Sequence, residues 1–302
     1  MSFAAVYLGL HEKGELNRRI EILNKILQSC TLCPRQCRVD RLNGETGYCR
    51  AGKELTVSSV FPHFGEEAPL VGRHGSGTIF LTHCNLRCVF CQNYEISHLG
   101  GGERATADQM ARYMVRLQDM GCHNINFVTP THYVPQIVAA LPQAIELGLR
   151  VPLVFNCGGY ESLDVIKLLE GVIDIYMPDV KFFSSAAAGR FCNAPDYPDV
   201  IRVVLKEMHR QVGDLKIDSR GVAERGLLVR HLVMPHGLAG TEDAMRFIVE
   251  QISPHSYVNI MAQYRPVYQA SEFPDLSRPV TMEEFREALD IARKFGICRG
   301  FE

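Results

Sequence analysis

The sequence has 302 residues, of which 46% are hydrophobic and 22% are charged, and its net charge is −2. This composition is close to that of average soluble globular proteins and argues against bulk nucleic-acid binding. No apolar run approaches the roughly 18 residues that a membrane helix needs, and the first residues carry neither a basic segment nor a cleavage pattern for export. We therefore expect a cytoplasmic protein with no membrane or nucleic-acid partner.

Cysteine is unusually frequent, with 11 residues. The odd number and the lack of an export pattern argue against a disulfide framework. Seven cysteines fall into two groups, and clustered thiols in a reducing compartment indicate metal binding. The four isolated cysteines are expected to be small buried residues: Cys122, Cys157, Cys192 and Cys298.

The chain begins with an expected amphipathic helix over residues 13–29, because apolar residues such as Leu16, Ile20 and Leu23 recur at helical spacing. Residues 54–75 are expected to form a connector of short extended pieces, with Glu66 and Glu67 exposed to solvent.

Between helix and connector lies the first cysteine group, with the spacing C-x2-C-x3-C-x11-C. We call this segment, residues 30–49, the cysteine knuckle. Its four cysteines are Cys30, Cys33, Cys37 and Cys49. Four thiolates on a turn-rich segment predict a closed metal site. Zinc and an auxiliary Fe–S cluster both suit thiolate ligands, and the spacing does not separate them.

From residue 77 onward, short runs rich in Val, Ile and Leu alternate with helical patterns. The expected strands are 78–81, 124–129, 152–156, 173–178, 227–234 and 257–262. The expected helices are 106–120, 134–147, 162–169, part of 197–212, 241–252 and 281–295. Continuous apolar strands are typical of a parallel sheet covered on both faces. Six such units predict an α/β fold, a partial (β/α)6 TIM-like barrel over residues 76–302, with residues 1–75 as an N-terminal helix, knuckle and connector. An open doubly wound sheet is the alternative.

Polar residues follow several of these strands, where the reactive groups of a parallel barrel gather. The candidates are Thr129–His132, Asn156–Tyr160, Asp179–Lys181, Arg230–Pro235 and Gln263–Arg265. Ordinary turn residues are an equally good explanation for each segment taken singly.

The second cysteine group lies after the first expected barrel strand, in the segment GTIFLTHCNLRCVFCQN, where Cys84, Cys88 and Cys91 have the spacing C-x3-C-x2-C. Most cubane Fe–S clusters have four cysteine ligands, so three thiolates leave one iron open to a small molecule. A zinc site usually takes a fourth ligand close by, and His83, adjacent to Cys84, is poorly placed to share one ion with it.

This spacing, with Phe90 just before the last cysteine, resembles the signature of the radical S-adenosylmethionine (SAM) superfamily. The resemblance implies a 4Fe–4S cluster whose open iron is chelated by the methionine moiety of SAM. One electron then cleaves SAM to give a 5′-deoxyadenosyl radical, which abstracts a hydrogen atom.

Within that superfamily the chain looks most like proteins related to pyruvate formate-lyase activating enzyme, over roughly residues 30–300. Asn156-Cys157-Gly158-Gly159, Asp179-Val180-Lys181 and Arg230 match motifs that surround SAM in such enzymes. The resemblance implies an oxidoreductase that activates a glycyl radical enzyme, with flavodoxin or ferredoxin as a low-potential electron donor.

The chain departs from that pattern after the second barrel strand, where Thr129-Pro130-Thr131-His132 replaces Gly-Gly-Glu. We expect the hydroxyls of Thr129 and Thr131 to accept hydrogen bonds from the SAM amino group. Two alternatives stay open: radical modification of a small molecule or peptide, and an Fe–S electron-transfer or metal-sensing protein without SAM chemistry.

Overall fold

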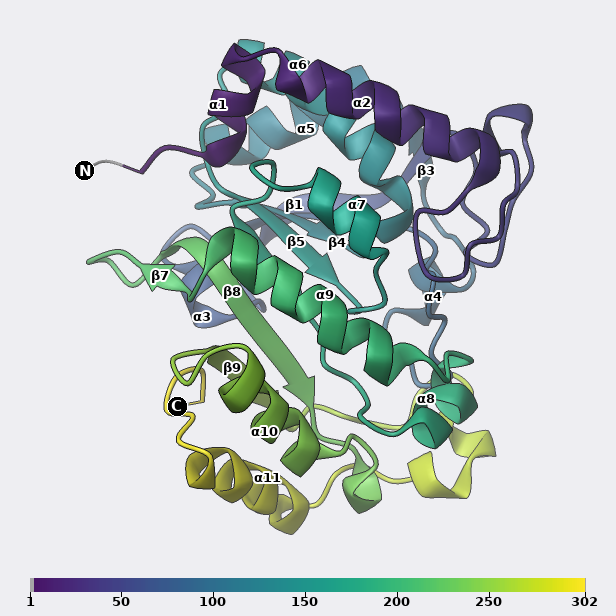
Figure 1. Ribbon diagram of the computed structural model, residues 1–302, viewed down its shortest axis with the longest axis vertical. Coiled ribbons are helices and arrows are strands. Elements are labelled where there is room, and N and C mark those ends of the chain that lie inside the picture. Colours follow the sequence, from purple (N-terminus) through teal and green to yellow (C-terminus); the bar gives the residue numbers. More distant parts are fainter. Residues whose placement is uncertain (1–2, 302) are drawn as a thin grey trace.

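A computed structural model describes residues 3–301. Its centre is a sheet whose strands follow the order β3-β1-β2-β4-β5-β6-β8-β7, with β9 paired to β8 (Figure 1). Six of these strands run parallel to one another: β2 (Ser76–Leu81), β4 (Ile125–Val128), β5 (Leu153–Cys157), β6 (Ile175–Pro178), β8 (Ala223–Leu232) and β9 (Tyr257–Met261). The six expected strands are thus confirmed, with small shifts at their ends.

The parallel strands are arranged in the order in which they occur along the chain, without the reversal that defines a doubly wound sheet. The sheet does not close, since β2 pairs on its outer side with the antiparallel β1 (Leu55–His63) rather than with β9. The partial barrel is therefore confirmed and the doubly wound alternative is wrong.

Helices alternate with the parallel strands as expected: α5 (Ala107–Asp119), α6 (Val134–Glu146), α7 (Leu163–Leu168), α9 (Tyr197–Val212), α10 (Thr241–Gln251) and α11 (Met282–Lys294). Local signals fix two of their starts, because Thr106 and Thr281 each form a capping box with the residue three positions later. The sequence analysis missed α8 (Ser185–Cys192), a short helix that begins with a Ser184 cap. It also missed the short strands β3 (Glu103–Ala105) and β7 (Lys216–Ile217).

The expected helix over residues 13–29 is wrong at its start and end. Gly14, with φ of 70°, separates α1 (Val6–Glu12) from α2 (Glu15–Ile26), and a 3-10 turn follows at Leu27–Ser29. Leu16 and Leu23 are buried on α2, which packs against α6 (Figure 1).

The connector is more ordered than expected, because β1 is a nine-residue strand with a bulge between Val57 and Ser59. The run TVSSVFPH lacks a clean alternation of apolar and polar residues, so the period-2 signal is weak. The connector also contains the short helix α3 (Ala68–Val71), and a second short helix, α4 (Tyr94–Ser97), lies after β2. The boundary at residue 75 stays a prediction.

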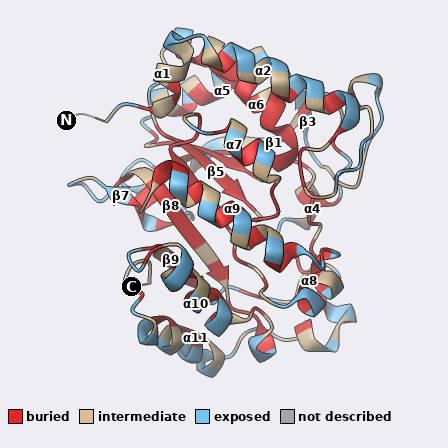
Figure 2. Ribbon diagram, in the orientation of Figure 1, coloured by how far each residue is buried: buried red, intermediate tan, exposed pale blue. Residues whose placement is uncertain are grey.

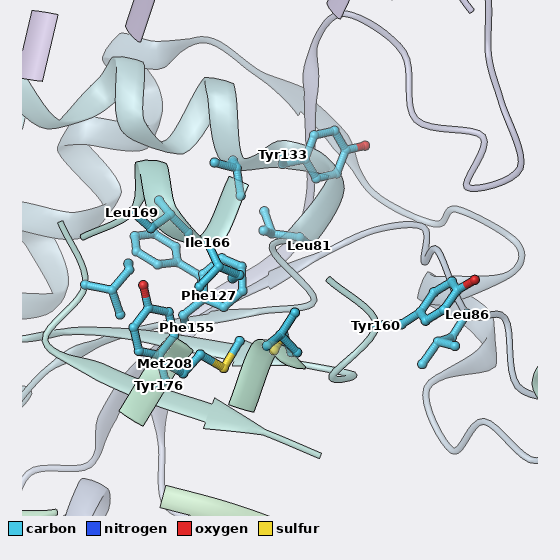
Figure 3. Close-up of a cluster of buried hydrophobic side chains, with 14 of the residues drawn as sticks. Leu81, Leu86, Phe127, Tyr133, Phe155, Tyr160, Ile166, Leu169, Tyr176 and Met208 are labelled. Carbon is cyan, nitrogen blue, oxygen red and sulfur yellow. The ribbon is translucent and has the colours of Figure 1, made fainter. Parts of the chain in front are cut away.

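Two apolar cores sit on either side of the sheet, whose central strands β2, β4, β5 and β6 are almost entirely buried, whereas β3 and β7 are largely exposed (Figure 2). The larger one joins Phe127, Phe155 and Tyr176 of three strands to Ile166 and Met208 of the covering helices (Figure 3).

The smaller core is closed by Leu70 of α3, which packs with Val154, Ile175, Met177 and Leu228. The strand residues of this smaller core come just before the polar residues at the carboxyl ends of the strands, where a cavity opens. Within residues 3–301, no helix is both long and apolar enough to cross a membrane.

Candidate active site

The carboxyl ends of the parallel strands meet at a cavity, as the fold rule predicts. Its wall includes Cys84, Cys88, Phe90 and Cys91 after β2, Val128 and Thr129 from β4, Asn156, Cys157 and Gly158 from β5, Asp179 and Lys181 after β6, Arg230 and Leu232 from β8, and Met261 and Gln263 from β9. The structure thus brings together most of the residues that the sequence analysis chose separately.

The segment over residues 82–93, which we call the cluster loop, holds its shape through main-chain contacts. The His83 amide donates to the Ile96 carbonyl at 2.9 Å, and the Val89 amide donates to the Phe191 carbonyl at 3.0 Å. His83 and Arg87 adopt left-handed backbone conformations, with φ of 69° and 54°. Such conformations are uncommon for these residues and cluster at functional sites.

The three thiols of the loop lie in an apolar environment that does not favour bare thiolates. Burial raises the pKa of Cys84 to about 12 and also raises the pKa of Cys91. Hydrogen bonding between the neutral Cys88 and Cys192 thiols, together with burial, raises the pKa of Cys88. A bound metal group supplies the positive charge that stabilises deprotonated sulfur.

Across residues 3–301, no three His, Cys, Asp or Glu side chains converge closely enough to hold a single metal ion. Three thiols on the wall of one cavity instead form a donor set for a cluster that takes one thiolate at each of several irons. These residues therefore fit a 4Fe–4S cluster.

The same cavity is also lined by a network of ion pairs and hydrogen bonds. Arg230 donates from Nε to Asp179 Oδ1 at 2.8 Å and from Nη2 to Asn156 Oδ1 at 2.8 Å. Lys181 Nζ donates to Asp179 Oδ2 at 2.6 Å. A β-bridge between Asp179 and Arg230 extends the pairing of β6 with β8 and sets these residues side by side.

The charges in this network stabilise one another. Burial on its own would raise the pKa of Asp179, but the positive charges of Arg230 and Lys181 hold it below its usual value. Burial likewise opposes the charged form of Lys181, yet Asp179 raises the pKa of that ammonium. Both cations are therefore charged at neutral pH and face the cavity.

Two further carboxylates approach Arg230 from the connector, and the expectation that they are solvated is wrong. Glu66 Oε2 lies 4.0 Å from Arg230 Nη1, and Glu67 Oε1 lies 3.9 Å from its Nε. Asn259 Nδ2 donates to Glu67 Oε1 at 3.2 Å. Burial raises the pKa of Glu66. The sequence gives no signal for this contact, because the two glutamates and Arg230 are far apart in the chain.

The two threonines after β4 take different positions. Thr129 lines the cavity with φ of 60°, and its amide donates to the Asn156 carbonyl at 2.9 Å. Thr131 does not line the cavity: its buried hydroxyl donates to Glu161 Oε1 at 2.9 Å. The structure therefore does not bring Thr131 to the site where we expected it.

Phe90 lines the cavity and packs edge-on against Phe182 and Tyr264, with ring centroids 5.9 and 6.0 Å away. Its ring contributes an apolar wall beside the cysteines.

Tyr197, in the first turn of α9, is a positioning residue that the sequence analysis missed. Its hydroxyl donates to the Asp179 carbonyl at 2.7 Å and accepts from the Lys181 amide at 3.0 Å. It also lies 3.0 Å from the Gly158 carbonyl, so that it joins the ends of β5 and β6. No local pattern could have found it, because its role depends on where α9 packs.

The cysteine knuckle lies beside the cluster loop. Cys30 and Cys33 are buried, Cys49 is half-buried and Cys37 is exposed. Burial raises the pKa of Cys33 and of Cys49. The Tyr48 amide donates to Cys37 Sγ at 3.4 Å.

Side chains of the knuckle, among them Tyr48 and Arg41, fasten it to the barrel. The Tyr48 hydroxyl donates to the Leu86 carbonyl at 3.4 Å. Arg41 is fully buried and donates to the His132 carbonyl at 2.7 Å. The knuckle is therefore attached both to the cluster loop and to the segment after β4.

Of the four isolated cysteines, Cys122, Cys157 and Cys192 are buried, as expected, whereas Cys298 is exposed, contrary to expectation. Cys157 lines the cavity, and Cys192 contacts Cys88.

Comparisons with known proteins agree with this site. The family model of the radical SAM superfamily matches residues 78–219. An uncharacterised protein of Methanocaldococcus jannaschii, MJ0674, is 34% identical over 292 residues, which cover 93% of this chain and 79% of that protein. The chain belongs to the radical SAM superfamily, a family that implies a 4Fe–4S cluster and SAM.

Solved structures of this superfamily have a similar fold. HydG, a maturase of the [FeFe]-hydrogenase, matches with a TM-score of 0.52 and 14% identity, covering 74% of this chain and 50% of its own. A radical SAM methyltransferase from Sphaerobacter thermophilus matches with a TM-score of 0.47 and 15% identity, covering 74% of this chain and 66% of its own. The chain thus spans half of HydG and just under two thirds of the methyltransferase.

Proposed function

We propose that this chain binds a 4Fe–4S cluster through Cys84, Cys88 and Cys91 and cleaves SAM reductively. The observation that supports this most directly is that the three thiols share one cavity with the network of Asp179, Lys181 and Arg230. A bound cluster supplies the electron that splits SAM into methionine and a 5′-deoxyadenosyl radical, which abstracts a hydrogen atom from substrate.

The protein residues contribute binding and orientation. Lys181 and Arg230 supply positive charge for the carboxylate of the methionine moiety, and a guanidinium suits that group. Asp179 accepts from both cations and Asn156 accepts from Arg230, so that the guanidinium is held from two sides before SAM arrives. Thr129 offers a hydroxyl on the cavity wall for the amino group.

The apolar residues of the cavity exclude water from a reactive radical. Leu86, Phe90, Val128, Leu232 and Met261 line the wall of this cavity.

For the target of the radical, we propose a backbone glycine of a partner protein, with flavodoxin or ferredoxin as electron donor. The support is the similarity of the Asn156–Gly159, Asp179–Lys181 and Arg230 motifs to those of glycyl-radical activating enzymes. Modification of a small molecule or peptide is the competing activity.

A single assay tests the cleavage. The chain is reconstituted anaerobically with iron and sulfide, reduced with dithionite and given SAM, and 5′-deoxyadenosine is quantified. We expect product from the wild type, no product from Cys84→Ala, Cys88→Ala or Cys91→Ala, and wild-type yield from Cys298→Ala, whose cysteine is exposed. An intact cluster without 5′-deoxyadenosine would favour electron transfer instead.

The target is tested by adding candidate glycyl-radical proteins to the reduced enzyme and SAM. A protein glycyl radical in the EPR spectrum would support activation. If 5′-deoxyadenosine forms but no candidate acquires a radical, the small-molecule or peptide activity is favoured.

A further inference from the structure

A second buried thiol touches a cysteine of the cluster loop. Cys192 Sγ donates a hydrogen bond to Cys88 Sγ across a sulfur–sulfur distance of 3.1 Å. The two residues are 104 positions apart in sequence, and their exposures are only 1% and 6%. From the cysteine spacing in the sequence, Cys192 was expected to be only a small buried residue.

The position of Cys192 is imposed by contacts that do not involve its sulfur. It is the last residue of α8, and Asn193, in the left-handed conformation with φ of 48°, caps the helix by donating its amide to the Ala188 carbonyl. The Phe191 carbonyl accepts from the Val89 amide at 3.0 Å. The end of α8 is therefore docked against the cluster loop through the Phe191 carbonyl.

A thiol that donates to a neighbouring sulfur is protonated and is not itself a ligand. When the neighbouring sulfur ligates iron, such a donor withdraws electron density from it and favours the more negatively charged, reduced state of the cluster. Buried surroundings strengthen this effect, because solvent does not compete for the hydrogen bond. Lys181, whose charge also acts on Cys88, works in the same direction.

We propose that Cys192 is a positioning residue of the cluster site, whose S–H group donates to the iron-bound sulfur of Cys88 and raises the reduction potential of the cluster. This inference rests on the proposed 4Fe–4S cluster but not on SAM cleavage. On this inference, Cys192 makes the cluster easier to reduce and does not contact the substrate.

The test compares the full-length wild type with Cys192→Ala, which removes the donor, and Cys192→Ser, which keeps an O–H donor. Cys192→Val fills the space without a donor if the alanine variant is unstable. Cys122→Ala is the matched control, since Cys122 is equally buried and its sulfur lies 3.9 Å from the His74 carbonyl, away from the cavity wall. Each protein is reconstituted anaerobically, iron and sulfide per chain are measured, and the potential is determined by EPR-monitored redox titration.

We expect equal iron content in all variants, a lower potential in Cys192→Ala or Cys192→Val, and values close to wild type in Cys192→Ser and Cys122→Ala. Equal potentials in all variants would overturn the inference while leaving the cluster in place. Loss of iron in Cys192→Ala, but not in Cys122→Ala, would identify Cys192 as a ligand and would also overturn it. A wild type that binds no cluster would overturn both this inference and the proposed function, whereas a cluster that does not cleave SAM would overturn only the latter.

Discussion

Arg35 of the cysteine knuckle donates from Nε to the main-chain carbonyl of Asn85, in the cluster loop, at 3.0 Å. The same guanidinium donates to the carbonyl oxygens of Cys192, at 3.0 Å, and of Asn193. It also stacks on the ring of Tyr48, 4.0 Å from the centroid. One side chain thus joins the knuckle, the cluster loop and the end of α8.

Replacing Arg35 with alanine should loosen the cluster loop. Carbonyl groups that lose a charged donor are left unpaired, so we expect the free energy of unfolding to fall by about 1–3 kcal/mol. We also expect iron to be lost faster to a chelator. Arg38→Ala is the control, because Arg38 is exposed on the same segment. Equal chelation rates in the two variants would show that Arg35 does not support the loop.

Gly159 permits the close approach of β5 to β6. Its φ is 78°, and a Cβ there would overlap the Asp179 carbonyl oxygen. Gly148 has φ of 101° but open space around it, so that Gly148→Ala isolates the cost of backbone strain. We expect about 1 kcal/mol of destabilisation for Gly148→Ala and about 2 kcal/mol more for Gly159→Ala. Urea unfolding measures both, and similar losses would contradict the crowding at Gly159.

Glu161 should give the protein a measurable pH dependence. Burial raises its pKa from 4.5 to about 7, against the opposing hydrogen bond from Thr131. Between pH 4.5 and about pH 7, Glu161 keeps its proton in the folded chain but has lost it in the unfolded chain. The contribution of this group to stability is therefore complete below pH 4.5 and is lost as the pH rises through 7.

Glu161→Gln keeps an acceptor for Thr131 but does not titrate. Relative to wild type, we expect the variant to gain stability between pH 4.5 and pH 8, by at most about 3 kcal/mol. Unfolding curves of both proteins at several pH values measure this gain. A difference that does not vary with pH would show that folding does not raise the pKa of Glu161.

The spacing of its four cysteines predicts zinc or a second Fe–S cluster in the knuckle, whereas among residues 3–301 the structure brings no three metal-binding side chains together around one ion. We expect Cys33→Ser to lower the metal content, by about one ion per chain if the site is a zinc site. Cys298→Ser is the control and should keep the wild-type content. Elemental analysis and the iron absorbance of each protein separate zinc from iron. Unchanged metal in Cys33→Ser would argue against a metal in the knuckle.

Local sequence signals predicted those parts of the fold that depend on neighbours in the chain. The six parallel strands and most of the helices that cover them were found from apolar runs and from caps such as Thr106 and Thr281. By contrast, β1 was seen only as extended pieces, and α8 was missed altogether. Their patterns are weak, and each is stabilised by packing against distant segments.

The candidate site divides in the same way. Asn156, Asp179 and Arg230 were predicted from their places at strand ends, and the structure brings them within hydrogen-bonding distance. Thr131 was chosen by the same rule, yet its side chain turns to Glu161. The rule gives the edge of the sheet at which a residue lies, but not the direction of its side chain.

The sequence by itself determined the class of chemistry, because both signals for it are local. The three cysteines of the cluster site lie within one short loop, and each parallel strand is visible as a short apolar run. The tertiary structure decided what surrounds that loop: Cys192 against Cys88, Arg35 on Asn85 and Tyr197 between β5 and β6. These contacts join residues far apart in the chain, so their geometry is set by how helices and loops pack and leaves no local pattern in the sequence.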